Sequence, residues 1–327
     1  MNASFFKWLT GAAMTVGIVM AVQAQPSSGI VNIVVPQPAG NPTDGVARKL
    51  QPLLQKELGQ TVIVENVPGA GGSIGVQKAL GQTQPNNLSL IIVSQTEPIL
   101  TPMTIKQARY KAEDFQAVAV VARLPYILVA RPNLSASTPA QVTELAKTAS
   151  APLNFGNIGP GSMIHLLGEQ WARKNGATLN QIPYKGVPPV AQDLMGGQID
   201  LTFLPLGGAT LSMIQSGKLK AIATSGASSP AQLPSVPSIA KSDTKMSDFV
   251  YCTWIALLMP AKTPPAVVTR LNRALVVAMR DPEFQSYVSI SGMDLVSANS
   301  LPELDRFYKE ETRLYQDLAR KIGVTAE

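Results

Sequence analysis

Short apolar runs alternate with helical patterns along the N-terminal third of the chain, and this order limits the folds that the chain can adopt. Residues 30–35 form an apolar run that Pro36 ends, which is typical of a buried strand. A helix pattern covers 42–58, with Asn41 expected as its N-cap. Two more strand runs follow at 61–65 and 88–93, separated by a second helix pattern. Strand–helix–strand–helix–strand order predicts a parallel sheet with helices on its faces. We therefore predict an α/β fold.

The middle of the chain repeats this pattern, with strand runs at 153–156 and 201–203 and helix patterns between them. Two longer apolar segments, 117–130 and 254–259, stand between the two α/β units. We interpret them as two passages of the chain between two lobes. The expected division is lobe 1, residues 25–125 plus 250–327, and lobe 2, residues 126–249.

The first residues predict export. Lys7 gives a positive start, the stretch 8–21 is apolar and uncharged, and Val22-Gln23-Ala24 has small residues where a signal peptidase requires them. This is the pattern of a secretory signal peptide, residues 1–24, with cleavage after Ala24. The alternative is an uncleaved membrane anchor, but a spanning helix needs ~20 apolar residues. The mature chain is therefore expected in the periplasm.

Charge and cysteine content exclude several classes of function. Lys7 carries one of the six net positive charges, so the mature chain keeps a modest basic excess. The basic residues are scattered without any Lys/Arg run, so we expect neither nucleic-acid nor membrane binding. Cys252 is the single cysteine and cannot form an internal disulfide. Because it lies in an apolar run, we expect a buried structural thiol.

Three loops share one design, in which a strand is followed by glycine, proline and small residues and then by a helix N-terminus. Helix N-termini carry unpaired N–H donors and the positive end of the dipole, so they bind anions without Lys or Arg. Ligands of open α/β sheets lie at the carboxyl ends of strands, where these loops are expected. Each loop alone is also explained as a tight turn, whereas three together favour a binding site. The loops are 36–44, 68–73 and 156–162.

The glycine-rich loop at 68–72 does not fit a nucleotide site. A dinucleotide fingerprint that begins at Gly69 and Gly71 needs a small third residue where Ile74 stands. No acidic residue occurs between Glu65 and Glu97 to bind a ribose, and the Lys-Ser/Thr pair of a P-loop is missing. We therefore predict no nucleotide and no cofactor.

Groups for catalysis or metal binding are scarce in the sequence, and we expect no serine in a G-x-S-x-G nucleophile elbow. His165 is the only histidine, which excludes a multi-histidine metal site, and we predict no metal. It falls in the first turn of the helix that Ser162 is placed to cap, where the dipole favours neutral imidazole. A role in the helix start is therefore favoured over that of a general base, and Asp44 is expected at a helix start too. Gln95 and Glu97 follow the third strand, and their position suggests a ligand contact.

At these residues the chain resembles the periplasmic solute-binding receptors of tripartite tricarboxylate transporters, the Bordetella uptake gene (Bug) family. The matching segments occur in the same order over nearly all of the mature chain. They are VPQPAGNPTDGVAR at 35–48, VIVENVPGAGGSIG at 62–75, LNFGNIGPGSMIHLLGE at 153–169, IPYKGVPPVAQDLMGGQID at 182–200, SGKLKAIATS at 216–225 and MPAKTPPAVVTRLN at 259–272.

The resemblance implies two α/β lobes around a deep ligand cleft, as in type II periplasmic binding proteins. Family members take up dicarboxylates, citrate-like acids, acidic amino acids and aromatic acids. One carboxylate of the ligand is held by the first loop and by the loop before the His-containing helix, partly through ordered water. In this sequence these positions are Ala39, Gly40, Thr43 and Asp44, and then Gly159, Gly161 and Ser162.

The chain departs from the family at the expected site. Gln37 and Asn41 stand where the family usually has Phe and Gly. The hydroxyl-rich run before the histidine is here Ser162-Met163-Ile164, so two expected donors have become apolar. Leu204-Pro205 replaces an acidic or amide residue that is common after this strand. The far end of the ligand is therefore expected to meet a different surface.

We predict a monomeric receptor that closes two lobes on a small carboxylate and presents it to the membrane subunits of a tripartite transporter, without chemistry. A side chain at Gly40 or Gly161 is expected to block the approach of the backbone to this ligand. The alternatives are a receptor that serves a sensor protein and, less favoured, a periplasmic hydrolase on the same scaffold. The predicted ligand contacts are Gln37, Ala39, Gly40, Thr43, Asp44, Gln95, Glu97, Gly159, Gly161, Ser162, His165 and Leu204.

Overall fold

Three parallel strands form the first part of the sheet. The computed structural model describes residues 29–82, 87–296 and 300–323. In it β1 (Ile30–Val35) lies between β2 (Thr61–Asn66) and β3 (Asn87–Val93), and both neighbours run parallel to it. The helices α1 (Pro42–Leu58) and α2 (Ser73–Gln82) connect these strands, which confirms the predicted order.

Both faces of β1 are buried, which explains its continuous apolar sequence. Val31, Ile33 and Val35 pack in one apolar cluster with side chains of α1. Val34 packs with side chains of α2 in a second cluster. Because successive side chains of a strand point to opposite faces, this strand needs a helix on each side of the sheet.

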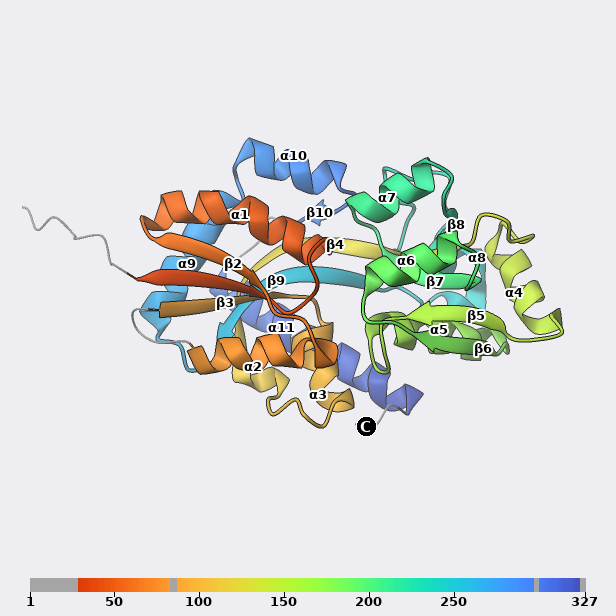
Figure 1. Ribbon diagram of the computed structural model, residues 1–327, viewed down its shortest axis with the longest axis horizontal. Coiled ribbons are helices and arrows are strands. Elements are labelled where there is room, and N and C mark those ends of the chain that lie inside the picture. The colour runs from red at the N-terminus through yellow and green to blue at the C-terminus, as the bar shows by residue number, and fades with distance from the viewer. Residues whose placement is uncertain (1–28, 83–86, 297–299, 324–327) are drawn as a thin grey trace, which may run out of the picture.

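A single long strand joins the two halves of the sheet. β4 (Phe115–Ala130) pairs with β9 (Cys252–Pro260) up to Pro125 and with β7 (Leu201–Pro205) from Tyr126 onward. The main path of the 10-stranded sheet runs β2-β1-β3-β9-β4-β7-β5-β6. In Figure 1, β4 and β9 cross the middle of the molecule between its two lobes. The lobe limits at 125/126 and 249/250 stay predictions, since a shared strand has no break at which the lobes separate.

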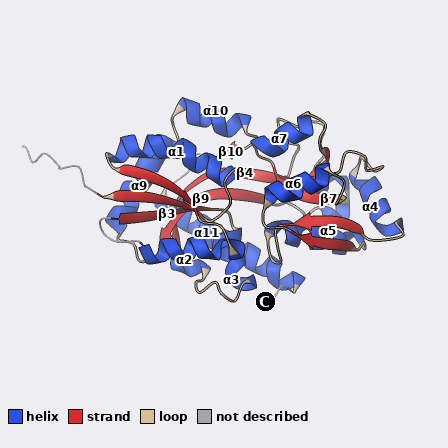
Figure 2. Cartoon of the chain, viewed as in Figure 1, coloured by secondary structure: helices blue, strands red, loops and turns tan. Residues whose placement is uncertain are grey.

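The second half of the sheet is covered by its own helices. β5 (Leu153–Asn157) runs parallel to β6 (Leu179–Pro183) and to β7, and β8 (Lys220–Thr224) lies antiparallel against β4. Figure 2 shows helices on either side of the strands in both lobes. The helices of this half are α4 (Pro139–Thr148), α5 (Met163–Asn175), α6 (Val187–Met195), α7 (Gly208–Gln215) and α8 (Ile239–Ser242).

The C-terminal helices return to the first half of the sheet. They are α9 (Pro265–Ala278), α10 (Pro282–Ile290) and α11 (Leu301–Ile322), with the short strand β10 (Asp294–Leu295) before α11. The last helix contacts both halves. The Tyr308 hydroxyl donates to the Ala112 carbonyl, and Arg173 of α5 donates to the carbonyls of Lys321 and Ile322. α11 therefore braces the two lobes in addition to the strand passages.

Short helical turns complete the described chain: η1 (Ala70–Gly72), η2 (Thr96–Leu100), α3 (Thr101–Thr104), η3 (Ala112–Asp114) and η4 (Thr244–Met246). In the part of the chain that the structure describes, no helix has the length and apolar character to cross a membrane. The predicted signal peptide, residues 1–24, lies outside the described residues.

Phe203 is fully buried in β7, with its ring centroid 6.1 Å from that of Phe155 and 5.8 Å from that of Phe249. Phe203→Ala should lower the free energy of unfolding by about 3–5 kcal/mol, because truncating a core ring leaves a cavity. Urea denaturation followed by circular dichroism measures this loss. Ile290, which is 70% exposed at the end of α10, gives the control. Ile290→Ala should change stability by no more than about 0.5 kcal/mol, and an equal loss in both variants would contradict the packing described.

Candidate ligand-binding site

A cavity of about 710 Å³ lies between the lobes, against the crossing strands β4 and β9. All three loops that were predicted to bind an anion reach it, through Pro38, Gly71 and Gly161 respectively. The crossing strands contribute Tyr126 and Thr253. The cavity therefore lies where the carboxyl ends of parallel strands from both lobes meet, as expected for an open α/β sheet.

Six of the twelve predicted contacts line this cavity and six do not. The lining residues are Gln37, Thr43, Glu97, Gly159, Gly161 and Ser162, and the others are Ala39, Gly40, Asp44, Gln95, His165 and Leu204. Most of the second group shape the site through their hydrogen bonds rather than by facing the cavity.

Asp44 orders the first loop and does not face the cavity. Its carboxylate accepts hydrogen bonds from Gly40 N at 3.1 Å, Arg48 Nε at 3.0 Å and Asn66 Nδ2 at 3.0 Å. Burial alone would raise the pKa of Asp44, but these donors hold it below its usual value. The Gly40 N–H is thereby occupied, and Ala39 and Gly40 are exposed outside the cavity. Within α1 itself, Thr43 lines the cavity and has a backbone N–H without an acceptor in the helix.

Asn41 occupies the N-cap position of α1, but its side chain does not cap the helix. Its Nδ2 instead donates to the Pro38 carbonyl at 2.9 Å. The predicted cap is therefore wrong for this side chain, because the turn from Pro38 to Asn41 brings that carbonyl within reach.

The loop before α5 uses its own side chains to hold its shape. The Ser162 hydroxyl donates to the Gly159 carbonyl at 2.7 Å and accepts from His165 N at 3.3 Å, which confirms the predicted cap. Gly161 N donates to His165 Nδ1 at 3.2 Å, so the histidine supports the helix start. The N–H groups of Met163 and Ile164, in the first turn of α5, have no acceptor within the helix, and both residues line the cavity.

Gln95 sets the direction of two hydroxyl groups on the crossing strands. It is fully buried, its Nε2 donates to the Tyr126 hydroxyl at 3.2 Å, and its Oε1 accepts from Thr253 Oγ1 at 3.0 Å. Burial raises the pKa of Tyr126, which therefore keeps its proton and can donate it in a hydrogen bond to a ligand. Gln95 acts on the cavity through these two residues, which the sequence analysis did not single out.

Glu97 is the buried carboxyl group of the cavity, at 3% exposure. Gln37 Nε2 donates to one of its oxygens, and the backbone and hydroxyl of Ser94 donate to the other at 3.0 and 2.9 Å. Thr43 Oγ1 in turn donates to Gln37 Oε1 at 2.6 Å. Burial raises the pKa of Glu97 although these donors oppose the shift.

Leu204 was predicted to contact the ligand, but its side chain does not face the cavity. Its side chain is fully buried in an apolar cluster with Ile127 and Val190, because strand alternation turns it away from the cavity. The next residue, Pro205, lines the cavity instead.

The two lobes touch at the edge of the cavity through glycines. A Cβ atom at Gly161 would lie 1.9 Å from Thr104 Cγ2, and one at Gly186 would lie 3.6 Å from Pro38 Cγ. Gly161 belongs to the α5 side and Thr104 to α3 of the other lobe. Close contact between the lobes therefore depends on the missing side chains. The space around Gly40 is open and Gly40 does not line the cavity, so the structure gives no support to the expected block at this position.

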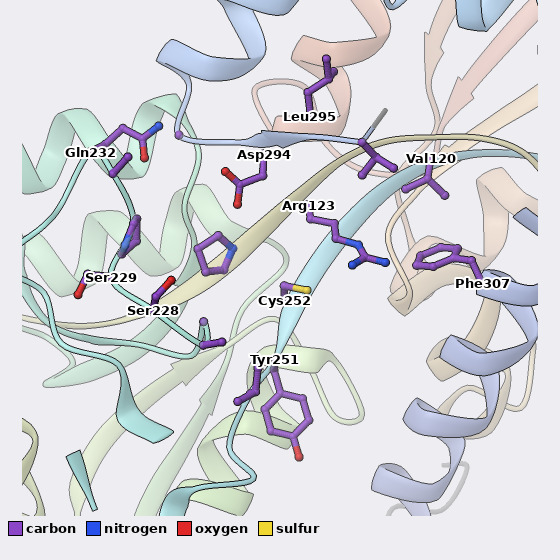
Figure 3. A pocket seen from close by; sticks show the side chains of 18 of the residues that line it. Val120, Arg123, Ser228, Ser229, Gln232, Tyr251, Cys252, Asp294, Leu295 and Phe307 are labelled. Carbon is purple, nitrogen blue, oxygen red and sulfur yellow. The ribbon is translucent and has the colours of Figure 1, made fainter. Parts of the chain in front are cut away.

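A second cavity, of about 770 Å³, lies on the opposite face of the crossing strands (Figure 3). The strand β4 lies between the two cavities, and its successive side chains point to opposite sides. Leu124 and Tyr126 line the first cavity, and Arg123 and Pro125 line the second. Figure 3 shows Cys252 here, half-buried rather than buried as predicted. Burial and nearby carboxylates raise the pKa of the Cys252 thiol to about 11, so it is a poor nucleophile at neutral pH.

The expectation that the chain has no nucleophile elbow is wrong, because Ser73 stands in one. The segment 71–75 has the G-x-S-x-G spacing of hydrolases. Ser73 is only 1% exposed and its Oγ has no hydrogen-bond partner, whereas a nucleophilic serine is accessible and paired with a base. Ser73 therefore lacks the access and the paired base that a nucleophilic serine needs. Among the described residues, no group of three or more His, Cys, Asp or Glu side chains could hold a metal ion.

Comparison with known proteins assigns the family. A family model described as the tripartite tricarboxylate transporter family receptor matches residues 46–324. The protein BugT of Bordetella pertussis is 31% identical over 315 residues, which cover 94% of each chain. The solved structure of the periplasmic binding protein BugD has a TM-score of 0.82 at 31% identity, covering 91% of this chain and 99% of that one.

A more distant solved structure, an R. palustris protein with adipate, shares the fold with a TM-score of 0.83 at 23% identity and covers 92% of this chain and 99% of its own. These matches agree with the resemblance seen in the sequence motifs and with the two lobes around one cavity. The chain belongs to the receptor family of the tripartite tricarboxylate transporters and has the two-lobed fold of periplasmic binding proteins.

Proposed function

We propose that this protein captures a small carboxylate in the cavity between its lobes and presents it to the membrane subunits of a tripartite transporter. The observation that carries this proposal is the convergence of two helix N-termini on one cavity. Thr43 of α1 and Met163 and Ile164 of α5 line its wall, and their first-turn N–H groups suit an anion. The family assignment supports the same conclusion.

Carboxylate binding here relies on the backbone more than on charged side chains. Lys185 is the only basic side chain among the described residues that line the cavity, and it is exposed. Each helix terminus contributes about 0.3–1 kcal/mol at an exposed site and up to about 2 kcal/mol where water is partly excluded. Closure of the lobes excludes water, so we infer that the ligand is held mainly in the closed form.

The positions of Ser73 and His165, the side chains that a hydrolase would use, disfavour a role as an enzyme. Ser73 is buried, and His165 Nδ1 accepts from the Gly161 backbone. A hydrolase on this scaffold would need both groups at the cavity.

A receptor that serves a sensor protein would have the same binding site as a transport receptor. The two differ in the membrane protein to which each presents its ligand. We propose a periplasmic monomer, released from its signal peptide after Ala24.

The direct test is a thermal-shift screen of the mature protein against mono-, di- and tricarboxylates, amino acids and neutral analogues. A ligand that binds only the native state raises the melting temperature by mass action, and we expect this for carboxylates but not for their amides. Calorimetric titration then gives the affinity. After hours of incubation, mass spectrometry should recover the ligand unchanged. Product that accumulates in proportion to protein concentration would contradict the receptor function.

The contact between lobes gives a second prediction, with a matched control. Gly161 and Gly40 both have left-handed backbones, with φ of 73° and 89°, but only Gly161 faces a neighbour, Thr104. Gly161→Ala should hold the lobes apart and weaken binding of the carboxylate found in the screen by about tenfold, whereas Gly40→Ala should bind like wild type. Solution scattering should show a larger radius of gyration for liganded Gly161→Ala. Equal affinities of these two variants would show that this contact does not control closure.

A further inference from the structure

One buried carboxyl group lies in the part of the cavity wall that the structure describes. Among the described residues that line the cavity, Glu97 is the only acidic and Lys185 the only basic side chain. Lys185 is exposed, whereas Glu97 is 3% exposed. A second carboxylate of a ligand would therefore meet a buried carboxyl group, and like charges in a site of low dielectric repel strongly.

Glu97 keeps capacity to bind a cation. One oxygen accepts a single bond from Gln37, and the other accepts two bonds from Ser94. All three partners are donors, which suits an ionised carboxylate, and the oxygen bonded to Gln37 has a second lone pair available. No ion pair found among the described residues includes Glu97. An ammonium group of a ligand would supply the missing positive charge.

The anion donors and Glu97 lie close to each other. Thr43, in the first turn of α1, donates to Gln37 at 2.6 Å, and the same Gln37 amide donates to Glu97. One amide group therefore separates the α1 terminus from the carboxyl group. A ligand with its carboxylate at the helix terminus and its ammonium at Glu97 would carry both groups close together, as an α-amino acid does on a single carbon.

The rest of the wall is uncharged. It contains apolar side chains such as Ile105, Ile164 and Ile255, together with the hydroxyl groups of Tyr126 and Thr253. This surface suits a ligand side chain without charge.

We propose that the ligand of this cavity is a neutral α-amino acid, and that Glu97 selects it by binding its ammonium group and by repelling dicarboxylates. This inference rests on the proposed carboxylate-receptor function and narrows it. A raised pKa of Glu97 fits the same picture, because an ammonium ligand would favour the ionised carboxylate and displace any proton bound there.

Paired probes test the inference by calorimetric titration of the mature protein. L-leucine is compared with 4-methylpentanoate and L-phenylalanine with 3-phenylpropanoate, while succinate and adipate represent dicarboxylates. We expect at least one amino acid to bind about tenfold or more tightly than its deaminated partner and than both dicarboxylates. Tighter binding of a dicarboxylate or of a deaminated acid would overturn the inference but leave the carboxylate-receptor function intact. Failure of every probe, with carboxylates in the wider screen also inactive, would overturn both.

Substitution of Glu97 tests its role with a matched control. Glu97→Gln keeps the shape of the side chain and removes its charge, and Glu57→Gln removes a charge from the exposed face of α1. Glu97→Gln should lose about tenfold or more in affinity for the amino acid and gain relative affinity for a dicarboxylate, while Glu57→Gln should match wild type. Unchanged selectivity in a folded Glu97→Gln protein would contradict the assignment.

Proton linkage in the wild-type protein covers the case in which Glu97→Gln does not fold. Titrations at mildly acidic pH in two buffers of different ionisation enthalpy should show proton release on amino-acid binding. Proton uptake instead would mean that Glu97 binds the ligand in its protonated form, and the proposal of an ammonium partner would be wrong.

Discussion

The shared strand β4 is the constraint on which the rest of the structure depends. Its first part pairs with β9 and its last residues pair with β7 and β8, so the two halves of the sheet are built on one backbone. Alternate side chains of this strand face two different cavities. Any rotation of the lobes about β4 and β9 therefore changes both cavities at once, since strand geometry fixes the opposite directions of neighbouring side chains.

In this site, some polar side chains hold the loops in place, and other polar groups line the cavity where a ligand would bind. Asp44, Ser162 and His165 have the chemistry of binding residues, yet each is occupied in holding a loop or a helix start. Thr43, Met163 and Ile164 line the cavity in the first turns of α1 and α5, where backbone N–H groups have no acceptor within the helix. Such donors are fixed before a ligand arrives, so little ordering of side chains is needed on binding.

The buried Glu97 places a carboxyl group in a cavity whose helix termini offer only hydrogen-bond donors. Gln37 connects Thr43 to Glu97 through one amide. A cavity with anion donors on one side and a buried carboxyl group beside them is suited to ligands that carry both signs of charge. The Gln37 amide helps to stabilise a buried carboxyl group at this position, because it supplies one of the donors of that group.

The sequence by itself determined the α/β class, the order of the strands, the helix starts at Ser162 and Pro42, and the three loops that meet at the cavity. These features follow from local periodicity, glycine and proline positions and capping residues, which act over a few neighbouring residues. Only the tertiary structure decided which side chains face the cavity. Leu204 and Pro205 are adjacent in sequence but face opposite sides of a strand, and Gln95 reaches the site through Tyr126 and Thr253, which are distant from it along the chain. The contact of Gly161 with Thr104 likewise joins two lobes, so it depends on their packing and has no signal in the local sequence.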